Sequence, residues 1–318
     1  MDQTASSPLV SIGLAVYNGE DYLEEAIDSI LSQTYRNFEL IISDNASTDR
    51  TAQICRRYAA ADSRVRYYRN VTNIGGANNE NLTFKYARGK YFRWAAHDDV
   101  LALTLLERCV AALEADPGAV LCFFDVVAIN AKGQPWRSFS QRLALSQDPA
   151  LRFREMASLS HRCEATYGLI RSSTLRVTGL QRNYTDSDRT FLANLALHGH
   201  FVHVPEVLFY QRHHEEMSTA VFPEWRQRML WFDERNRERI TLPYWSQLLH
   251  YMEVITRAPV ALQVKLECYA YMAQWVTEER RWRKLGKDLV LAGTALLRKG
   301  AQALPILPRK LSRKAHYQ

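Results

Sequence analysis

One stretch of the chain decides the fold prediction: Tyr91-Phe92-Arg93-Trp94-Ala95-Ala96-His97-Asp98-Asp99-Val100. Its apolar and aromatic residues predict a buried strand, which ends at two adjacent carboxylates. Ligands of open α/β sheets bind at the carboxyl ends of the strands. Two neighbouring acids there favour a nearby cation, and Mg²⁺ or Mn²⁺ on a phosphorylated substrate would suit their hard oxygen ligands. The alternative is a solvated turn in which Asp99 caps the next helix.

Three more strands are predicted upstream, at residues 9–17, 38–43 and 65–68. A segment with helical spacing of apolar residues, or a glycine- and asparagine-rich turn leading into one, follows each of them. This alternation predicts an α/β fold with a mainly parallel sheet flanked by helices. Asp44 ends the second strand as Asp98 and Asp99 end the fourth, so we expect all three acids to face one crevice.

The amino-acid composition indicates which broad class of protein this chain belongs to. A hydrophobic content of 47% and a charged content of 24% are typical of a soluble globular chain. No apolar run reaches the length of a membrane span, the first eight residues show no signal-peptide pattern, and the five scattered cysteines form no metal spacing. We therefore expect a cytoplasmic protein. The formal net charge of +7 comes largely from residues after Trp282, and no nucleic-acid-binding module accompanies it.

Several short motifs follow one another in order: Ala15-Val16-Tyr17-Asn18-Gly19-Glu20, Ser29-Ile30-Leu31-Ser32-Gln33-Thr34-Tyr35, Phe38-Glu39-Leu40-Ile41-Ile42-Ser43-Asp44-Asn45-Ala46-Ser47-Thr48-Asp49, Asn73-Ile74-Gly75 through Asn81, Ala87-Arg88-Gly89-Lys90-Tyr91 and Asp98-Asp99. Together they resemble glycosyltransferase family 2, whose members have the GT-A nucleotide-sugar fold. Each fragment is weak, but their conjunction is specific.

The resemblance implies a donor site. It implies that Tyr17 lies near the base, that Asp44 hydrogen-bonds the base, and that Asp98 and Asp99 serve the ribose and a divalent metal, Mn²⁺ or Mg²⁺. These residue types suit the implied roles. An aromatic ring offers a base a stacking face, and a metal neutralises a departing diphosphate. The matching positions extend the implied nucleotide-sugar site to a wider set: Ala15, Asn18, Glu20, Asn73 and Asn81.

Two departures from the family pattern matter. The family usually has proline at Ala15 and aspartate at Ala96, and the missing carboxylate leaves open which atoms reach the ribose and the metal. His97 is a substitute ligand or a surface residue. The family often ends its catalytic domain with Tyr-x-Arg-x-His, a register that selects Arg212 for the diphosphate and His214 for the metal. A basic surface loop is the alternative for these two residues.

An acid before a predicted helix is the candidate catalytic base. Inverting glycosyl transfer needs one group to take the proton of the acceptor hydroxyl, and the family places an aspartate at the start of such a helix. Asp188 fits that register best, and Asp186 is the alternative. Capping of the helix N-terminus is the structural role open to both.

The rest of the chain divides into two parts. We expect a GT-A catalytic domain over residues 1–220, with a nucleotide-sugar half (1–100) and an acceptor half (101–220), and a helical region over 221–318. Processive relatives carry Gln-x-x-Arg-Trp after the base. The nearest match, Gln227-Arg228-Met229-Leu230-Trp231, lacks the arginine, so a single addition is predicted. Aromatic residues at helical spacing beyond 224 predict core packing or homodimer contacts.

The tail alternates basic clusters with apolar residues. Between 283 and 314 this pattern suits an interfacial helix on the anionic inner face of a membrane, and equally an ordinary amphipathic helix with a basic tail.

These features together predict a metal-dependent, inverting, non-processive glycosyltransferase. It would move one sugar from a nucleotide-diphosphate donor to a hydroxyl of a glycan or lipid-linked acceptor, in cell-surface polysaccharide synthesis. The rivals are a nucleotidyltransferase, which the lack of a glycine-rich phosphate loop disfavours, and an inactive nucleotide-sugar-binding or scaffold protein, which the Ala96 substitution favours.

Overall fold

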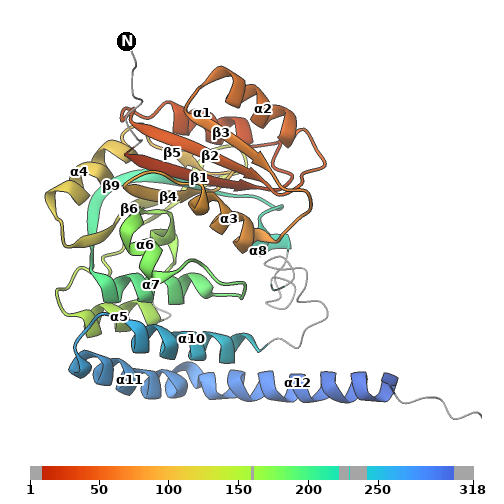
Figure 1. Cartoon of the computed structure of the whole chain (residues 1–318), viewed down its shortest axis with the longest axis vertical. Helices are drawn as coiled ribbons and strands as arrows, with labels where there is room; N and C mark the ends of the chain where they lie inside the picture. Colours follow the sequence, from red (N-terminus) through yellow and green to blue (C-terminus); the bar gives the residue numbers. More distant parts are fainter. Residues whose placement is uncertain (1–8, 159–160, 222–228, 230–241, 304–318) are drawn as a thin grey trace, which may run out of the picture.

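The computed structural model describes residues 9–158, 161–221, 229 and 242–303. Its first part alternates strands and helices (Figure 1), in the order β1 (Val10–Val16), α1 (Leu23–Leu31), β2 (Phe38–Asp44), α2 (Thr51–Ala61), β3 (Val65–Arg69), α3 (Gly76–Lys85) and β4 (Tyr91–Ala95). The alternation predicted from the sequence is confirmed.

Parallel pairing brings the predicted strand ends together. β1 pairs with β2 and β4, and β2 pairs with β3, all in parallel. Val16 lies opposite Asp44, so β1 and β2 end level with each other. Gly13 in β1 lets α3 approach closely, because a Cβ there would lie 2.1 Å from the Thr83 hydroxyl oxygen. The carboxyl ends of these strands therefore form one edge, as the sequence predicted.

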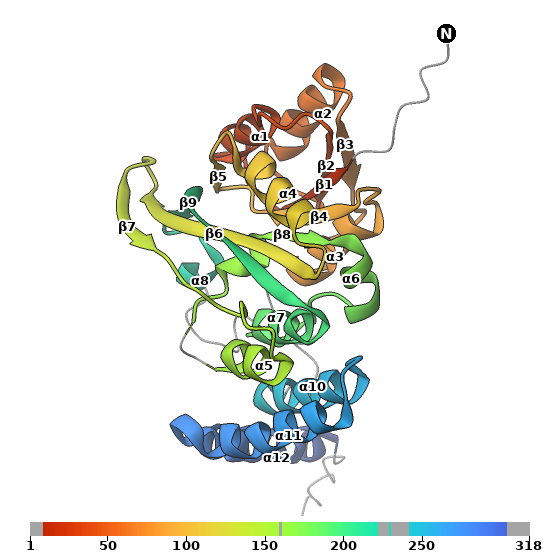
Figure 2. The same cartoon turned by 90° about the vertical axis from the view of Figure 1, so that its left-hand side faces the viewer.

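The second part adds antiparallel and mixed pairing. Its elements are β5 (Val100–Leu101), α4 (Leu105–Ala115), β6 (Ala119–Asn130), β7 (Pro135–Phe139), α5 (Pro149–Ala157), η1 (Glu164–Tyr167), β8 (Leu169–Arg171), α6 (Ser172–Thr178), α7 (Ser187–His198), β9 (His200–His213) and α8 (Ser218–Val221). The described strands form one nine-stranded sheet, β3-β2-β1-β4-β8-β6-β9-β5, with β7 beside β6 (Figure 2).

β9 contains an internal proline. Pro205 and Glu206 would by local rules predict a turn between two strands, but β9 runs without a break from His200 to His213. Val204 pairs with Phe124 and Val207 with the next residue of β6, so Pro205 and Glu206 form a bulge. A bulge tolerates proline because the extra residues leave the hydrogen-bonded ladder.

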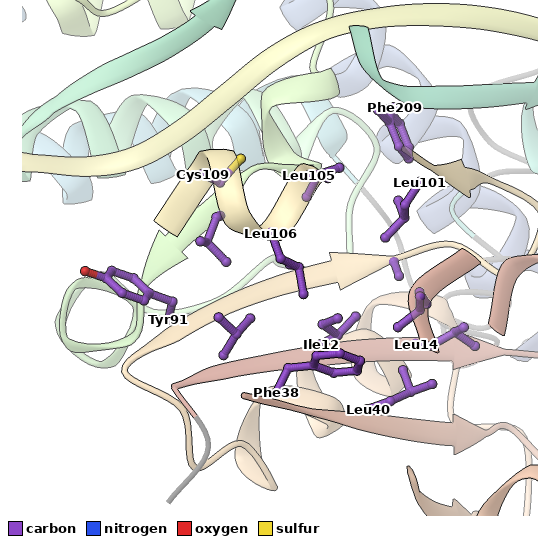
Figure 3. Close-up of a cluster of buried hydrophobic side chains, with 14 of the residues drawn as sticks. Ile12, Leu14, Phe38, Leu40, Tyr91, Leu101, Leu105, Leu106, Cys109 and Phe209 are labelled. Atoms are coloured by element: carbon purple, nitrogen blue, oxygen red, sulfur yellow. The ribbon is translucent and has the colours of Figure 1, made fainter. Parts of the chain in front are cut away.

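The helices cover both faces of the sheet. α1, α2 and α4 pack on one face, where Leu23, Ile27 and Ile30 of α1 are buried as their spacing predicted (Figure 1). Figure 3 shows part of this core: Ile12, Leu14, Phe38, Leu40, Tyr91, Leu101, Leu105, Leu106, Cys109 and Phe209. α3, α6 and α7 lie on the other face.

The C-terminal helices stack beyond α7 and α5 (Figure 2). They are α10 (Pro243–Arg257), α11 (Leu262–Thr277), the short η3 (Glu278–Arg280) and α12 (Arg281–Ala303). Tyr251 and Trp275 are buried against Phe153, and Trp275 Nε1 donates to the carbonyl of Ala157 at 3.1 Å. The prediction that these aromatics pack in a core is confirmed. The boundary predicted at 220 adjoins residues outside the described part.

Across the described ranges, we find no helix that combines the length and apolar character needed to cross a membrane. The Gln227–Trp231 motif lies, apart from Met229, outside the described residues.

Candidate active site

A cavity of about 870 Å³ opens where β1 and β4 end and α7 begins. This volume is in the range of ligand pockets, about 300–1,000 Å³. The cavity lies at the sheet edge that the sequence predicted. Its lining includes both candidate bases, both candidate metal ligands and five of the residues predicted for the nucleotide sugar: Ala15, Tyr17, Asn18, Asp98, Arg212, Asp99, His214, Asp186 and Asp188.

The loop after β1 forms one wall of the cavity. Tyr17 is 45% exposed and presents its ring there. Asn18 has a left-handed backbone (φ 50°), which asparagine tolerates better than most residues. Its side-chain Oδ1 accepts from the Thr48 N–H at 2.8 Å, and its own N–H donates to Ser47 Oγ at 3.0 Å. These bonds fix the β1 loop against the loop after β2.

Asp44 lies outside the cavity lining. Its carboxylate is fully buried and accepts from the Ser47 N–H and the Tyr67 hydroxyl, both at 2.8 Å. Asn73 also lies outside it and accepts from the Asn45 side-chain amide at 2.8 Å. In this structure, both predicted ligands hold the loops of the donor side. That Asp44 and Asn73 contact the base stays a prediction. Binding a base would require them to give up these hydrogen bonds within the protein.

Glu20 and Asn81 are likewise absent from the lining. Glu20 Oε2 accepts from the Arg50 N–H at 2.9 Å and pairs with its guanidinium at 3.0 Å. Asn81 Nδ2 donates to the Gln181 carbonyl at 2.7 Å, which joins α3 to the segment before α7. These contacts position the walls of the cavity.

The two acids after β4 have different partners. Asp98 Oδ2 lies 2.9 Å from His214 Nε2. Asp99 Oδ1 accepts from the Arg212 N–H at 2.8 Å. The Arg212 guanidinium donates to the Asp98 carbonyl at 2.8 Å and pairs with Glu25 at 2.6 Å. Arg212 thus fixes the acidic turn from behind, while Asp98 and His214 form one acid–imidazole pair.

The pKa values of Asp98 and Asp99 are shifted in opposite directions. Burial, and then the charge of Asp98, raise the pKa of Asp99 well above its ordinary value. Burial also acts to raise the pKa of Asp98, but the hydrogen bond from His214 and the nearby His97 hold it below its ordinary value. His97 lies against Gly19, where a Cβ would lie 2.5 Å from the ring. Asp98 therefore carries the negative charge of the turn, while Asp99 favours its protonated form.

The two candidate bases, Asp186 and Asp188, differ in solvent exposure and in position on α7. Asp186 is exposed at the N-cap of α7 in a left-handed backbone (φ 67°). Asp188 lies half-buried in the first turn of α7, where the helix dipole favours a negative charge. The Asp188 charge contributes to raising the pKa of both Glu80 and Cys163, which places it among the cavity groups.

Sequence reasoning missed Glu80. This residue of α3 lines the cavity, and burial, followed by the charge of Asp188, raises its pKa to about 7. Residue type and spacing alone held no clear signal for Glu80. The structure places it three residues from Ala77 and from Thr83, which are both buried, and so on the inward side of the helix.

Sequence reasoning also missed Tyr22, whose ring lies 4.8 Å from the His214 ring and 4.7 Å from the Arg212 guanidinium. Arg212 and His214, the two residues that contact the acidic turn, therefore pack on one aromatic ring.

The family model described as glycosyl transferase family 2 matches residues 11–176, more than half of the chain. The chain belongs to glycosyltransferase family 2. An uncharacterized glycosyltransferase from Rickettsia typhi is 33% identical to it over 231 residues, which cover 69% of this chain and 68% of that protein. The activity of this family 2 member is accordingly that of a glycosyltransferase.

Solved structures agree on the fold of this glycosyltransferase. S. aureus TarS in complex with UDP-GlcNAc is similar with a TM-score of 0.62 at 18% identity, over 86% of this chain and 74% of that one. The Pyrobaculum calidifontis mannosyltransferase PcManGT, in complex with GDP-Man and Mn²⁺, gives a TM-score of 0.50 at 18% identity, over 92% and 88%. The GT-A fold expected from the sequence is confirmed.

Proposed function

We propose that this glycosyltransferase is inverting, metal-dependent and non-processive. It moves one sugar from a nucleotide-diphosphate donor to a hydroxyl of a glycan or lipid-linked acceptor, in cell-surface polysaccharide synthesis. The observation that supports this best is that Asp188 and the Asp98–His214 pair line the same cavity. Inverting transfer needs a proton acceptor and a charge-stabilising site around one reacting centre.

Asp188 is the base in this proposal. Its carboxylate takes the proton of the acceptor hydroxyl as that oxygen forms a bond to the anomeric carbon of the sugar. The bond from that carbon to the diphosphate breaks, and its electron pair leaves with the diphosphate. The setting of Asp188 supports this role over Asp186, because Asp188 is half-buried among other cavity groups and Asp186 is exposed.

In the described part of the chain, no group of three or more His, Cys, Asp or Glu side chains is placed to hold a metal, and Asp98 and His214 are proposed as two ligands that the diphosphate would complement. Asp98 and His214 supply an oxygen and a nitrogen 2.9 Å apart, the donor types that manganese accepts. Among the described residues, the buried His214 Nδ1 has no hydrogen-bond partner, and a cation nearby would favour the ionised form of Asp98 and Asp99. When bound, the cation would supply charge neutralisation for the leaving diphosphate. We therefore shift the ligand proposal from the Asp99–His214 pair to Asp98 and His214, because Arg212 engages Asp99.

The donor is proposed to be a nucleoside diphosphate sugar. Tyr17 and Asn18 offer a ring and an amide at the mouth of the cavity, as a base and ribose would require. Arg212 lines the cavity beside the acidic turn and holds that turn in place. The bound UDP-GlcNAc and GDP-Man of the two similar structures support this donor class without naming the sugar used by this chain.

An inactive binding protein is not favoured. Ala96 removes one acid, but the candidate base, the acid–imidazole pair and Arg212 all line the cavity. A single addition is proposed because Gln227–Trp231 lacks the arginine of the processive pattern.

Helix α12, the described part of the basic tail, supports the proposal that the protein binds the membrane surface. Arg281 and Leu285 are buried and attach α12 to the protein, while Trp282, Leu289 and Val290 are each more than half exposed. Basic residues adjoin them: Arg283, Lys284 and Lys287. Such a surface would favour the anionic cytoplasmic face of a membrane, or a homodimer contact. Co-sedimentation with anionic but not neutral vesicles would support the membrane partner.

A donor screen tests the enzymatic proposal. Purified protein is incubated with UDP-, GDP- and dTDP-sugars, with Mn²⁺, Mg²⁺ or a chelator, and released nucleoside diphosphate is measured. We expect slow, metal-dependent hydrolysis of one donor. Asp98→Ala should abolish it, and Asp28→Asn, on the exposed side of α1, is the matched control. Donor binding without release, even when candidate acceptors are added, would refute the catalytic proposal.

A further inference from the structure

The lining of the cavity includes five polar residues, here named the polar floor: Glu80, Thr166, Tyr167, Ser187 and Asp188. They come from α3, η1 and the start of α7, segments far apart in the sequence. The proposed reaction uses only Asp188. The polar floor is therefore a set of hydrogen-bonding groups whose purpose the reaction alone does not explain.

Within the described part of the chain, two hydroxyl groups of the polar floor have no hydrogen-bond partner. Thr166 and Ser187 are 5% and 1% exposed, and the side-chain oxygen of each is buried without a hydrogen bond. A buried hydroxyl without a partner costs about 1–3 kcal/mol. Both residues line the cavity, so a ligand that carries hydroxyl groups could satisfy them.

Glu80 adds a carboxylate to this set. No hydrogen bond or ion pair of its carboxylate is found within the described part of the chain, although its main-chain carbonyl accepts from Trp94 Nε1 at 3.0 Å. The titratable groups that face it are Asp188 from α7 and Tyr167 from η1, and neither is a cation. Glu80 is therefore half-buried in the cavity lining and has no positive partner among the described residues.

The position of α3 assigns the polar floor to the donor. α3 follows β3 in the nucleotide-sugar half and packs on β1, whose end carries Ala15 and Tyr17 of the donor wall. A sugar attached to a diphosphate near Asp98 would extend from that wall toward Asp188. An ionised carboxylate accepts hydrogen bonds from two adjacent hydroxyls and repels a second carboxylate.

We propose that Glu80, with Thr166 and Ser187, recognises the transferred sugar, and that it selects a neutral sugar with adjacent free hydroxyls against a uronic acid. This inference rests on the proposed function and deepens it, because it names the class of donor sugar. Asp188 then meets the acceptor while Glu80 holds the sugar beside it.

The test compares each sugar nucleotide with its bare nucleotide. Affinities of wild type, Glu80→Gln and Glu80→Ala are measured by calorimetry for UDP, UDP-glucose, UDP-glucuronic acid, GDP, GDP-mannose, dTDP and dTDP-glucose, with Mn²⁺ present. In the wild type, a neutral sugar should add affinity over the bare nucleotide. Glu80→Ala should lower that gain by about 10- to 100-fold, the value of a charged hydrogen bond, and leave the bare nucleotide unchanged. Glu267→Gln on α11 is the matched surface control.

Two further readouts separate recognition from a structural role. Glu80→Gln should reduce the discrimination against UDP-glucuronic acid, because it removes a negative charge. The sugar-dependent gain of the wild type should rise from pH 6 to pH 8, because burial raises the pKa of Glu80 to about 7, and it should be flat in Glu80→Gln.

The outcomes are distinguishable. If no bare nucleotide and no sugar nucleotide binds, the proposed function itself fails. If nucleotides bind but no neutral sugar adds affinity, or if the gain persists in Glu80→Ala, the inference is refuted. A change confined to the KM of the acceptor would also refute it, because Glu80 would then face the acceptor.

Discussion

Replacing Glu80 by glutamine should stabilise the protein at alkaline pH. Burial, and then the charge of Asp188, raise the pKa of Glu80 from 4.5 to about 7. The folded protein therefore keeps a proton that the unfolded chain releases above pH 4.5, so stability falls as pH rises from 4.5 to 7 and then levels off. Each pH unit of this difference corresponds to about 1.4 kcal/mol, so ionised Glu80 costs the fold about 3 kcal/mol at pH 8.

Urea unfolding at pH 5 and pH 8, followed by tryptophan fluorescence without donor or metal, measures this cost. The free energy of unfolding of Glu80→Gln should gain about 2–3 kcal/mol over wild type between the two pH values. Glu267→Gln removes an exposed carboxylate of α11 and should follow the wild type. Parallel pH profiles for Glu80→Gln and wild type would refute the reasoning, because they would mean that Glu80 ionises in the folded state as it does in water.

Three other changes have directions that follow from the structure. Asp188→Asn should lower kcat by about 10²–10⁴ with little change in donor affinity. Asp186→Asn should retain most of the activity. Equal losses of kcat in the two variants would contradict the assignment of Asp188 as the base. Arg212→Ala should lower the free energy of unfolding by about 3 kcal/mol, because it leaves buried acceptors such as the Asp98 carbonyl without a partner. A melting temperature unchanged from wild type would rule this out. His250 has its pKa lowered to about 4, chiefly by burial, so the unfolded chain binds the proton first as pH falls below 6.5. His250→Gln should therefore lose about 2 kcal/mol less than wild type between pH 7 and pH 5 in urea titrations.

Local pattern was enough to predict the first half of the fold. The apolar runs of β1, β2 and β4 are long, and the helices between them have clear apolar faces, so alternation and parallel pairing followed from periodicity. The second half was harder, because its strands are short or bulged. β8 has three residues, and β9 contains Pro205, which local rules treat as a break. Pairing with β6 overrides that rule.

The candidate site also has a part that local sequence predicted and a part that depends on contacts between distant segments. The acids Asp98 and Asp99 were found because they end a strand, and the position of a strand end is a local property. Their individual partners were not predictable, since His214 and Arg212 approach from β9 and the loop beyond it, more than one hundred residues away. The tertiary contacts therefore favour Asp98 over Asp99 as the proposed metal ligand.

The sequence by itself determined the class of protein, the parallel edge of the sheet and the family, because these depend on periodic burial and on motifs in fixed order. Only the tertiary structure decided which polar side chains reach the cavity. Asp44 is engaged by its neighbours and Glu80 is not, although both are acids in the same half of the chain. The physical reason is that a hydrogen-bond partner and the degree of burial are set by packing between distant segments, which residue type and spacing do not encode.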